Sequence, residues 1–236
     1  MGKSFICVFF FILKVEKHKI KGLTSSNPEL VAVLRKRFTK EGSYYGDDLF
    51  VITPFLHLLP IDRIIILDVN LKFRADIQDL WTEFNKFSPS SVIGVAPELS
   101  PVYYHYTHQY RKENPSTKVG LTEPKHMQGI NSGVVLLDLE KIRSQPELLL
   151  LRLDPSEVEH LHRKYNIWGG LGDQDLITLL SFEHPDLFHF LSCGWNRALC
   201  LWWRHVYPDL FERYFSCNDE VKIYHANCGS SFPPNA

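Results

Sequence analysis

The chain has 236 residues, with 26 Lys and Arg against 27 Asp and Glu, which gives a formal net charge of −1. Hydrophobic residues make up 44% of it, enough to bury the core of one sizeable globular domain. The near-neutral charge, with basic and acidic side chains interspersed, argues against nucleic-acid binding. The 16 Phe, 10 Tyr and 5 Trp argue against disorder.

Residues 1–20 form an apolar N-terminal segment. Its uninterrupted apolar run, residues 5–13, is too short to span a bilayer. Two interpretations stay open: a signal-peptide core without a small-x-small cleavage site behind it, or a buried strand. Residues 21–236 contain no repeat, low-complexity tract or Gly/Ser linker, so we expect them to form a single domain.

Segments with helical and strand-like patterns alternate along this domain. A Ser-Asn-Pro opening starts the first helix, and Ser156 with Glu159 predicts a capping box on a later one. The β-branched run at 63–67 is typical of a strand buried on both faces. The alternation predicts an α/β fold with a mixed, mostly parallel sheet. The expected helices are 27–40, 47–59 (bent or broken at Pro54), 75–84, 156–165 and 173–182, and the expected strands are 63–67, 91–96, 133–137 and 221–225.

Polar residues that directly follow apolar runs are the first candidates for a site, because ligands in open α/β sheets bind beyond the carboxyl ends of the strands. Asp68 and Asn70 are two residues apart, so their oxygens point the same way and can share a divalent cation. The alternative is that these residues have no role in binding, because polar residues commonly follow a strand. Combined with the distant strand-end His225, the pair makes a mixed oxygen and nitrogen set suited to Mn²⁺. Glu98 and Asp138 also follow apolar runs.

A second candidate is the run Leu171-Gly172-Asp173-Gln174-Asp175, at the head of the expected helix 173–182. One interpretation is that its acidic side chains cap the helix and complement its dipole. The other is that Gly172 lets the backbone approach a ligand while Asp173 and Gln174 hydrogen-bond to its hydroxyls. The pattern by itself favours the capping interpretation.

Four cysteines gather near the end of the chain. They lack the C-x2–4-C knuckle of structural zinc sites, so disulfides are favoured and an oxidising compartment is implied. Of three possible connectivities, the sequential one closes the shortest loops and is the expected one: Cys193 with Cys200, and Cys217 with Cys228. Around them, Trp195, Trp202 and Trp203 stand beside amides and arginines in the sequence. This cluster is typical of a disulfide-bonded core, of a surface that binds a sugar by stacking, or of both.

Several of these motifs together resemble one family closely. The likeness runs from Tyr44 to Pro234 almost without gaps, and it is to the xyloside α-1,3-xylosyltransferases, retaining enzymes of glycosyltransferase family 8. The motifs include Asp68-Val69-Asn70-Leu71-Lys72-Phe73, Asn131-Ser132-Gly133-Val134, Leu171-Gly172-Asp173-Gln174-Asp175, Trp195-Asn196-Arg197 and Lys222-Ile223-Tyr224-His225.

The resemblance implies a GT-A-type, Rossmann-like fold on the lumenal side of the endoplasmic reticulum, with Mn²⁺ as cofactor. It also implies transfer of xylose from UDP-xylose, in α-1,3 linkage, to a xylosyl-glucose glycan O-linked to EGF-like repeats such as those of Notch. The site residues that it implies are Asp68, Asn70 and His225 for the metal, Val69, Ser132, Leu171, Gln174, Trp203 and Asn227 for the substrates, Gln174 and Asp173 for catalysis, and Cys193, Cys200, Cys217 and Cys228 for two disulfides. Because an amide is a poor nucleophile, same-face attack by the acceptor is preferred to a covalent intermediate at Gln174.

Two departures from the family pattern bear on activity. Asn70 stands where the family has a second Asp, which removes one anionic ligand. Residues 1–43 take the place of a membrane anchor and of the family's first nucleotide-binding βαβ portion, which is therefore expected to be incomplete. A non-catalytic relative or truncated product that binds glycosylated EGF repeats without transfer is the alternative function.

Overall fold

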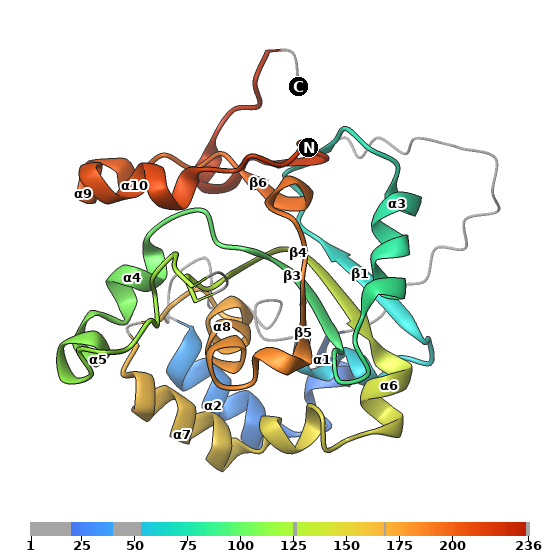
Figure 1. Ribbon diagram of the computed structural model, residues 1–236. Helices are drawn as coiled ribbons and strands as arrows, with labels where there is room; N and C mark the ends of the chain where they lie inside the picture. Colours follow the sequence, from blue (N-terminus) through green and yellow to red (C-terminus); the bar gives the residue numbers. More distant parts are fainter. Residues whose placement is uncertain (1–19, 40–52, 125–126, 168, 235–236) are drawn as a thin grey trace.

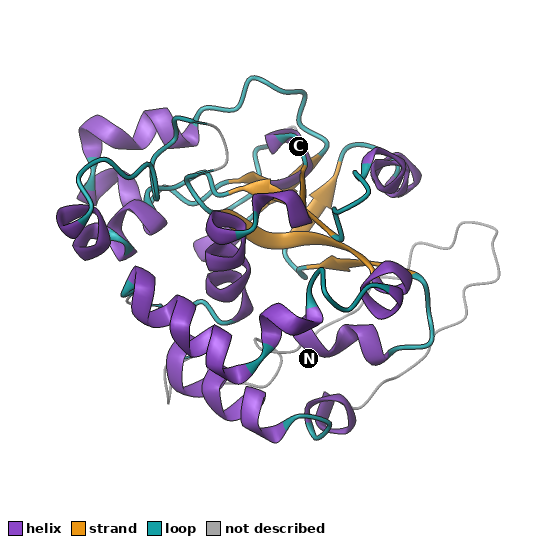
Figure 2. Ribbon diagram, turned by 60° about the horizontal axis from the view of Figure 1, so that its bottom comes forward, coloured by secondary structure: helices purple, strands orange, loops and turns teal. Residues whose placement is uncertain are grey.

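The computed structural model describes residues 20–39, 53–124, 127–167 and 169–234. Residues 1–19 of the apolar N-terminal segment and residues 47–52 of the expected helix 47–59 lie outside these ranges. Helices surround two small β-sheets on several sides (Figures 1 and 2). The elements are α1 Ile20–Thr24, α2 Pro28–Phe38, η3 Thr53–Leu58, β1 Arg63–Leu67, β2 Leu71–Phe73, α3 Ile77–Trp81, η4 Thr82–Lys86, β3 Ile93–Pro97, α4 Val102–Tyr106, α5 His108–Glu113, β4 Ile130–Asp138, α6 Leu139–Ser144, η5 Leu150–Leu153, α7 Pro155–Tyr165, α8 Asp173–Glu183, η6 Pro185–Leu187, β5 Phe188–Phe190, η7 Cys193–Asn196, β6 Arg197–Ala198, α9 Trp203–Val206, α10 Pro208–Phe215, β7 Ile223–His225 and η8 Asn227–Gly229.

The sheets are mixed in direction. The larger has the order β1-β4-β3-β5, and the smaller has the order β2-β7-β6. Strands β1, β3 and β5 run one way and β4 runs the other, since β4 pairs antiparallel with both β1 and β3 while β3 pairs parallel with β5. The α/β expectation is confirmed. The expectation of mostly parallel pairing is wrong for the described strands, because β2 and β7 also pair antiparallel and only β6 with β7 adds a second parallel pair.

Burial differs sharply between two strands that look alike in sequence. All but one of the nine residues of β4 are buried, whereas every residue of β1 is only half-buried. Strand β1 lies at the edge of its sheet, and β4 is its only partner among the described strands. The expectation that β1 is buried on both faces is therefore wrong: a β-branched run marks a strand without fixing its place in the sheet.

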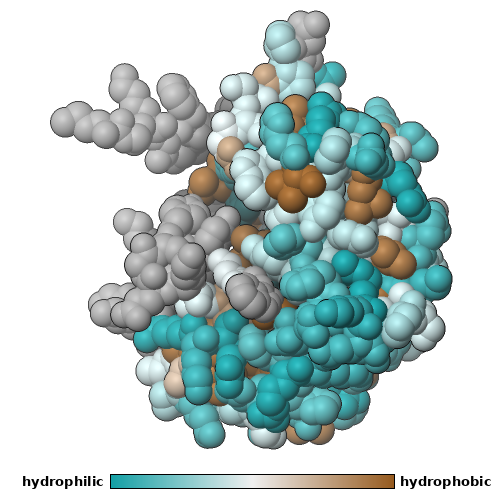
Figure 3. All heavy atoms as spheres, turned by 90° about the vertical axis from the view of Figure 1, so that its left-hand side faces the viewer, coloured by the Kyte–Doolittle hydropathy of each residue, from teal (hydrophilic) through white to brown (hydrophobic). Residues whose placement is uncertain are grey.

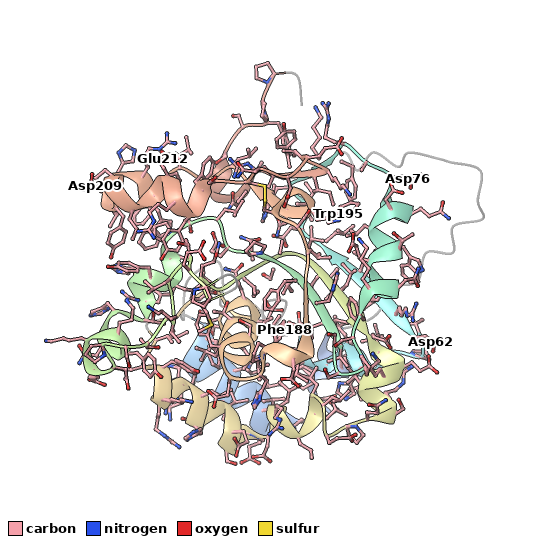
Figure 4. The ribbon with its side chains drawn as sticks, viewed as in Figure 1. Asp62, Asp76, Phe188, Trp195, Asp209 and Glu212 are labelled. Atoms are coloured by element: carbon pink, nitrogen blue, oxygen red, sulfur yellow. A yellow bond between two sulfur atoms is a disulfide. The ribbon has the colours of Figure 1, made fainter. Side chains whose placement is uncertain are left out.

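Two hydrophobic clusters hold the layers together. The larger packs α2, α7 and α8 against one face of the larger sheet. The smaller lies between the two sheets and centres on Trp195, which is 1% exposed and clusters with Val134 of β4 and Ile223 of β7 (Figure 4). The smaller sheet, which carries His225, is thereby fixed against the larger one.

The helix starts are set by local hydrogen bonds. Asn27, the first residue of the expected helix 27–40, caps α2: its side chain accepts from the backbone nitrogen of Leu30 at 3.0 Å. Helix α7, by contrast, is capped by Asp154, two residues before Ser156, where the capping box was expected to begin. Glu159 does not reach back to the helix start, because its carboxylate pairs with Arg37 of α2 at 2.8 Å.

The disulfides cross each other along the chain. Cys193 bonds to Cys217, and Cys200 bonds to Cys228. The expected sequential pairing is wrong: loop length alone selects the shortest loops, whereas the folded chain brings η7 beside the segment after α10, and β6 beside η8. No helix in the described ranges is long and apolar enough to cross a membrane.

Candidate functional site

Backbone pairing at one edge of the larger sheet brings Asp68 and His225 together. The nitrogen of Asp68, directly after β1, donates to the carbonyl oxygen of Gly133 near the start of β4, at 3.0 Å. The chain then turns through the fully exposed Val69 into β2, where Leu71 pairs with His225. As a result, Nε2 of His225 lies 3.3 Å from Oδ2 of Asp68.

Asp138 does not belong to this site, although it too follows an apolar run. Because β4 runs antiparallel to β1, its carboxyl end lies at the opposite edge of the sheet, where Asp138 pairs with Arg63 at 3.4 Å and caps α6 through the nitrogen of Lys141. The start of β4 takes its place at the site edge, with Asn131 and Ser132.

The Asp68 and His225 pair fits a divalent cation. Ligand atoms around an octahedral cation lie about 3 Å apart, close to the 3.3 Å found here. The Asp68 side chain is 52% exposed and that of His225 is 5% exposed, so the carboxylate faces solvent while the imidazole is buried behind it. The ring nitrogen Nδ1 of His225 lies 3.0 Å from Oδ1 of Asn196, which leaves Nε2 for a metal.

Asn70 lies beside this pair but is already engaged. Its side-chain nitrogen donates to the carbonyl oxygen of Ala226 at 3.0 Å, and its own carbonyl accepts from the nitrogen of Ala226 at 3.0 Å. Only its amide oxygen remains as a ligand atom. A neutral oxygen is a weaker ligand for a hard cation than a carboxylate.

The close approach of His225 to β4 requires a glycine at position 133. A Cβ atom there would lie 2.5 Å from both Cε1 and Nδ1 of the imidazole ring, closer than real contacts allow. The motif Asn131-Ser132-Gly133 contains this residue, yet nothing in the sequence alone pairs it with a histidine 92 positions further on.

Gln174 and Asp173 lie at the head of α8, beside the same sheet edge. The amide oxygen of Gln174 accepts from the backbone nitrogen of Ser132 at 3.0 Å and from its hydroxyl at 3.2 Å, which ties α8 to β4. Asp173 accepts a hydrogen bond from the hydroxyl of Thr53. Burial raises the pKa of Asp173 to about 7, and the negative charge of Asp68 adds to the rise.

The interpretation that acidic side chains of the run 171–175 cap helix α8 is wrong, because no side chain caps the start of this helix. The residue at the helix start is Gly172, which has no side chain to cap with and a φ of 67°. Asp175 instead holds the loop before the helix, because its carboxylate accepts from the nitrogens of Gly170 at 2.7 Å and Leu171 at 2.8 Å. The hydroxyl of Tyr103 donates to the same carboxylate at 3.0 Å.

Two further residues singled out by the resemblance have other contacts. The amide oxygen of Asn227 accepts from the nitrogens of Leu199 and Cys200 at 3.0 and 2.9 Å, so it holds the loop after β6. Trp203, on α9, stacks on Tyr207 with ring centroids 6.0 Å apart. It belongs to the side that carries α4, α5, α9 and α10, where apolar residues form separate patches among hydrophilic ones (Figure 3).

Three metal-ligating groups of the described chain also meet at Cys193, Cys217 and Asp219. The two sulfur atoms of that cluster form a disulfide, so they are not available to bind a cation. The edge that carries Asp68 and His225 is therefore the better cation site.

Comparison with known proteins identifies the family. No protein-family model matches the chain. Xyloside xylosyltransferase 1 of Mus musculus and that of Homo sapiens are each 46% identical to it over 228 residues, which cover 94% of this chain and 58% of theirs. The crystal structure of the mouse enzyme in its apo form is 45% identical and superposes with a TM-score of 0.84, over 91% of this chain and 75% of that one. The chain belongs to the xyloside xylosyltransferase family.

The wider fold is shared with more distant glycosyltransferases. The galactosyltransferase LgtC, solved with donor and acceptor sugar analogues, matches 86% of this chain and 68% of its own with a TM-score of 0.50. At 15% identity this likeness shows the fold alone. The GT-A expectation is confirmed, and the chain spans 58% of the length of the curated xyloside xylosyltransferases that it matches.

Proposed function

We propose that the protein transfers xylose from UDP-xylose, with retention and in α-1,3 linkage, to a xylosyl-glucose glycan on EGF-like repeats in the endoplasmic reticulum lumen. The observation that carries the proposal is the meeting of Asp68 and His225, 3.3 Å apart, in a chain 46% identical to xyloside xylosyltransferases. The two disulfides are consistent with an oxidising compartment.

Asp68, His225 and the remaining oxygen of Asn70 would hold the cation. A divalent cation such as Mn²⁺ supplies positive charge that stabilises the diphosphate leaving group. Asp173 and Gln174 lie at the same edge and face the sugar in this proposal, with Val69, Leu171, Trp203 and Asn227 contacting donor or acceptor.

The position of Gln174 favours same-face attack by the acceptor hydroxyl. Its amide oxygen already accepts two hydrogen bonds from Ser132, so a covalent bond to that oxygen would break both. Mass spectrometry of the protein incubated with donor alone should find no glycosylated peptide that contains Gln174 or Asp173. A trapped glycosyl-enzyme at either residue would reject this mechanism.

The direct test is transfer by this chain to an EGF repeat that carries the xylosyl-glucose glycan, with and without Mn²⁺. We expect Mn²⁺-dependent addition of one xylose, lost in Asp68→Ala. Asp62→Ala is the matched control: Asp62 is 77% exposed at the other end of β1, so this variant should transfer normally (Figure 4). Transfer that is equal in the two variants would contradict the proposed site.

A second candidate is binding of glycosylated EGF repeats without transfer. The side-chain nitrogen of Asn70 donates to Ala226 and the site lacks one carboxylate, which favours weak cation and donor binding. Interferometry with immobilised glycosylated EGF repeats separates the two candidates. Acceptor binding together with no donor turnover at saturating Mn²⁺ would support this second function over the first.

A further inference from the structure

We propose that Glu98 positions His225 for cation binding through a buried chain of two asparagine amides, Asn131 and Asn196, which fixes the imidazole in its Nδ1–H tautomer. The inference deepens the proposed function and rests on its cation site. The four side chains come from β4, η7, β7 and the residue after β3, so they join both sheets. All four residues are 4% exposed or less, which keeps solvent from replacing any member of the chain.

The first step is the orientation of the Asn131 amide. Its nitrogen donates to Oε2 of Glu98 at 2.8 Å, and its oxygen accepts from the backbone nitrogen of Gly133 at 3.0 Å. A backbone N–H can only donate, and Glu98 also accepts hydrogen bonds from the backbone and hydroxyl of Ser100. The Asn131 amide is therefore held from both ends and cannot rotate without losing both bonds.

Asn196 takes its orientation from Asn131. Its side-chain nitrogen donates to Oδ1 of Asn131 at 2.9 Å and to the backbone oxygen of Asn131 at 3.2 Å. Both partners are acceptors only, so the nitrogen of the Asn196 amide must face them. Its oxygen then faces His225, 3.0 Å from Nδ1.

The tautomer of His225 follows. An amide oxygen can only accept, so Nδ1 carries the proton and Nε2 of the neutral ring presents its lone pair toward Asp68. Without the buried chain, the carboxylate of Asp68 would favour the opposite tautomer, with the proton on Nε2 donated to Oδ2. That tautomer has no lone pair for a cation at Nε2. The buried amides thus keep the proton on the side of the ring away from the site.

The test reads the tautomer directly, without any metal. Long-range ¹H–¹⁵N correlation spectra of the metal-free protein at about pH 8 distinguish the two ring nitrogens of His225. We expect a protonated Nδ1 and a bare Nε2 in the wild type. In Asn196→Leu, which removes the acceptor for Nδ1–H, we expect the signals to shift toward the Nε2–H tautomer.

Affinity for Mn²⁺ alone, measured by electron paramagnetic resonance titration, gives the second readout. Loss of a hydrogen-bond partner behind a metal ligand weakens binding about 10–100-fold, and we expect this range for Asn196→Leu. Glu98→Gln serves if that variant does not fold. It replaces one of the two acceptor oxygens of the carboxylate with an NH2 group that can only donate, which weakens the hold on Asn131 and Ser100. We therefore expect the same tautomer shift in part and a smaller loss of affinity.

Glu83→Gln is the matched control. Glu83 is also a buried glutamate, 6% exposed, but it accepts hydrogen bonds from Trp195 and Lys86 and has no bond to the amide chain. Glu83→Gln should leave the ¹H–¹⁵N signals of the His225 ring and the affinity for Mn²⁺ unchanged.

The outcomes separate the two proposals. An Nε2–H tautomer in the wild type, or an unchanged spectrum in both Asn196→Leu and Glu98→Gln, would overturn the role of the amide chain. A wild type with the Nδ1–H tautomer that binds no Mn²⁺ would reject the cation site of the proposed function and still uphold the control of the tautomer by Glu98.

Discussion

Asn70 is the uncharged member of the proposed cation site. In Asn70→Asp, the carboxylate cannot donate to the carbonyl of Ala226, so we expect the metal-free protein to lose about 1 kcal/mol of unfolding free energy. The same carboxylate adds an anionic ligand, so we expect tighter Mn²⁺ binding and a lower Mn²⁺ requirement for turnover. Calorimetric titration with Mn²⁺ and thermal unfolding in chelator measure the two effects.

The control for this variant is Asn114→Asp. The side-chain nitrogen of Asn114 also donates to a backbone carbonyl, that of Tyr110, at 2.9 Å, but it lies at the exposed end of α5. It therefore changes the charge by the same amount and removes the same kind of hydrogen bond. A Mn²⁺ titration that is identical in Asn70→Asp and wild type would show that position 70 does not bind the cation.

Gly133 tests whether the close packing of His225 matters. In Gly133→Ala the new methyl group would lie 2.5 Å from the imidazole, so the ring must move away from Asp68. We expect Mn²⁺ binding to weaken at least tenfold and stability to fall by about 1–3 kcal/mol. Gly22→Ala is the control, since a Cβ atom there meets nothing within 4 Å. Mn²⁺ binding at full strength in Gly133→Ala would mean that the ring position tolerates this shift.

At the residue scale, the sequence predicts the two proposed cation ligands better than the amides packed behind them. Asp68 and His225 follow apolar runs, and the rule for strand ends brings them together. Glu98 also follows such a run, but Asn131 and Asn196 appear only as parts of motifs. Their role depends on which amide end faces which neighbour, and that is decided by contacts between four separate elements.

At the scale of elements, helix α8 carries two carboxyl groups with opposite pH behaviour. Burial raises the pKa of Asp175 to about 6, although hydrogen bonds from Gly170, Leu171 and Tyr103 oppose the rise. At the other end of the helix, the pKa of Glu183 is lowered: burial acts to raise it, but hydrogen bonds from Lys164 and Tyr165 outweigh burial.

The sign of each contribution follows from linkage. Folded Asp175 holds its proton more tightly than the unfolded chain, so its contribution to stability is complete below about pH 4 and is lost as pH rises through about 6. In Asp175→Asn this dependence disappears, while the amide oxygen still accepts from Gly170 and Leu171. We expect urea denaturation between pH 7 and pH 4 to show the wild type gaining up to about 3 kcal/mol relative to the variant as pH falls.

Glu183→Gln should give the opposite trend. The contribution of Glu183 is present above the unfolded pKa of a glutamate and is lost as pH falls, so the wild type should lose stability relative to this variant on acidification. If the difference between wild type and Asp175→Asn stays flat over the same range, the pKa of Asp175 is not raised by folding.

Element positions follow from the sequence more reliably than their pairing. The expected strand 63–67 coincides with β1, and the expected helix 173–182 ends one residue before α8 does. Short 3₁₀ helices such as η7 leave no periodic pattern and were not expected. The sequence does not reveal strand direction, because β4 contains an unbroken apolar run and burial on both faces selects such a run in antiparallel as well as in parallel sheets.

At the scale of the whole molecule, crossed disulfides hold the C-terminal part of the site. Cys200–Cys228 closes a loop with a sequence separation of 28, and His225 lies inside it. The nitrogen of Leu199 donates to the carbonyl of His225 at 3.0 Å, and Asn227 holds the same loop. The bridge therefore supports the backbone of a proposed metal ligand in addition to restricting the unfolded chain.

The double variant Cys200→Ser with Cys228→Ser separates these two effects. Loss of a loop of this size should lower the free energy of unfolding by about 3–4 kcal/mol, and release of the backbone at His225 should also weaken Mn²⁺ binding. Peptide mapping without reduction should recover Cys193 with Cys217 in the double variant. Stability that falls while Mn²⁺ affinity stays unchanged would mean that the packing of Trp195 between the two sheets, and not the disulfide, holds His225 in place.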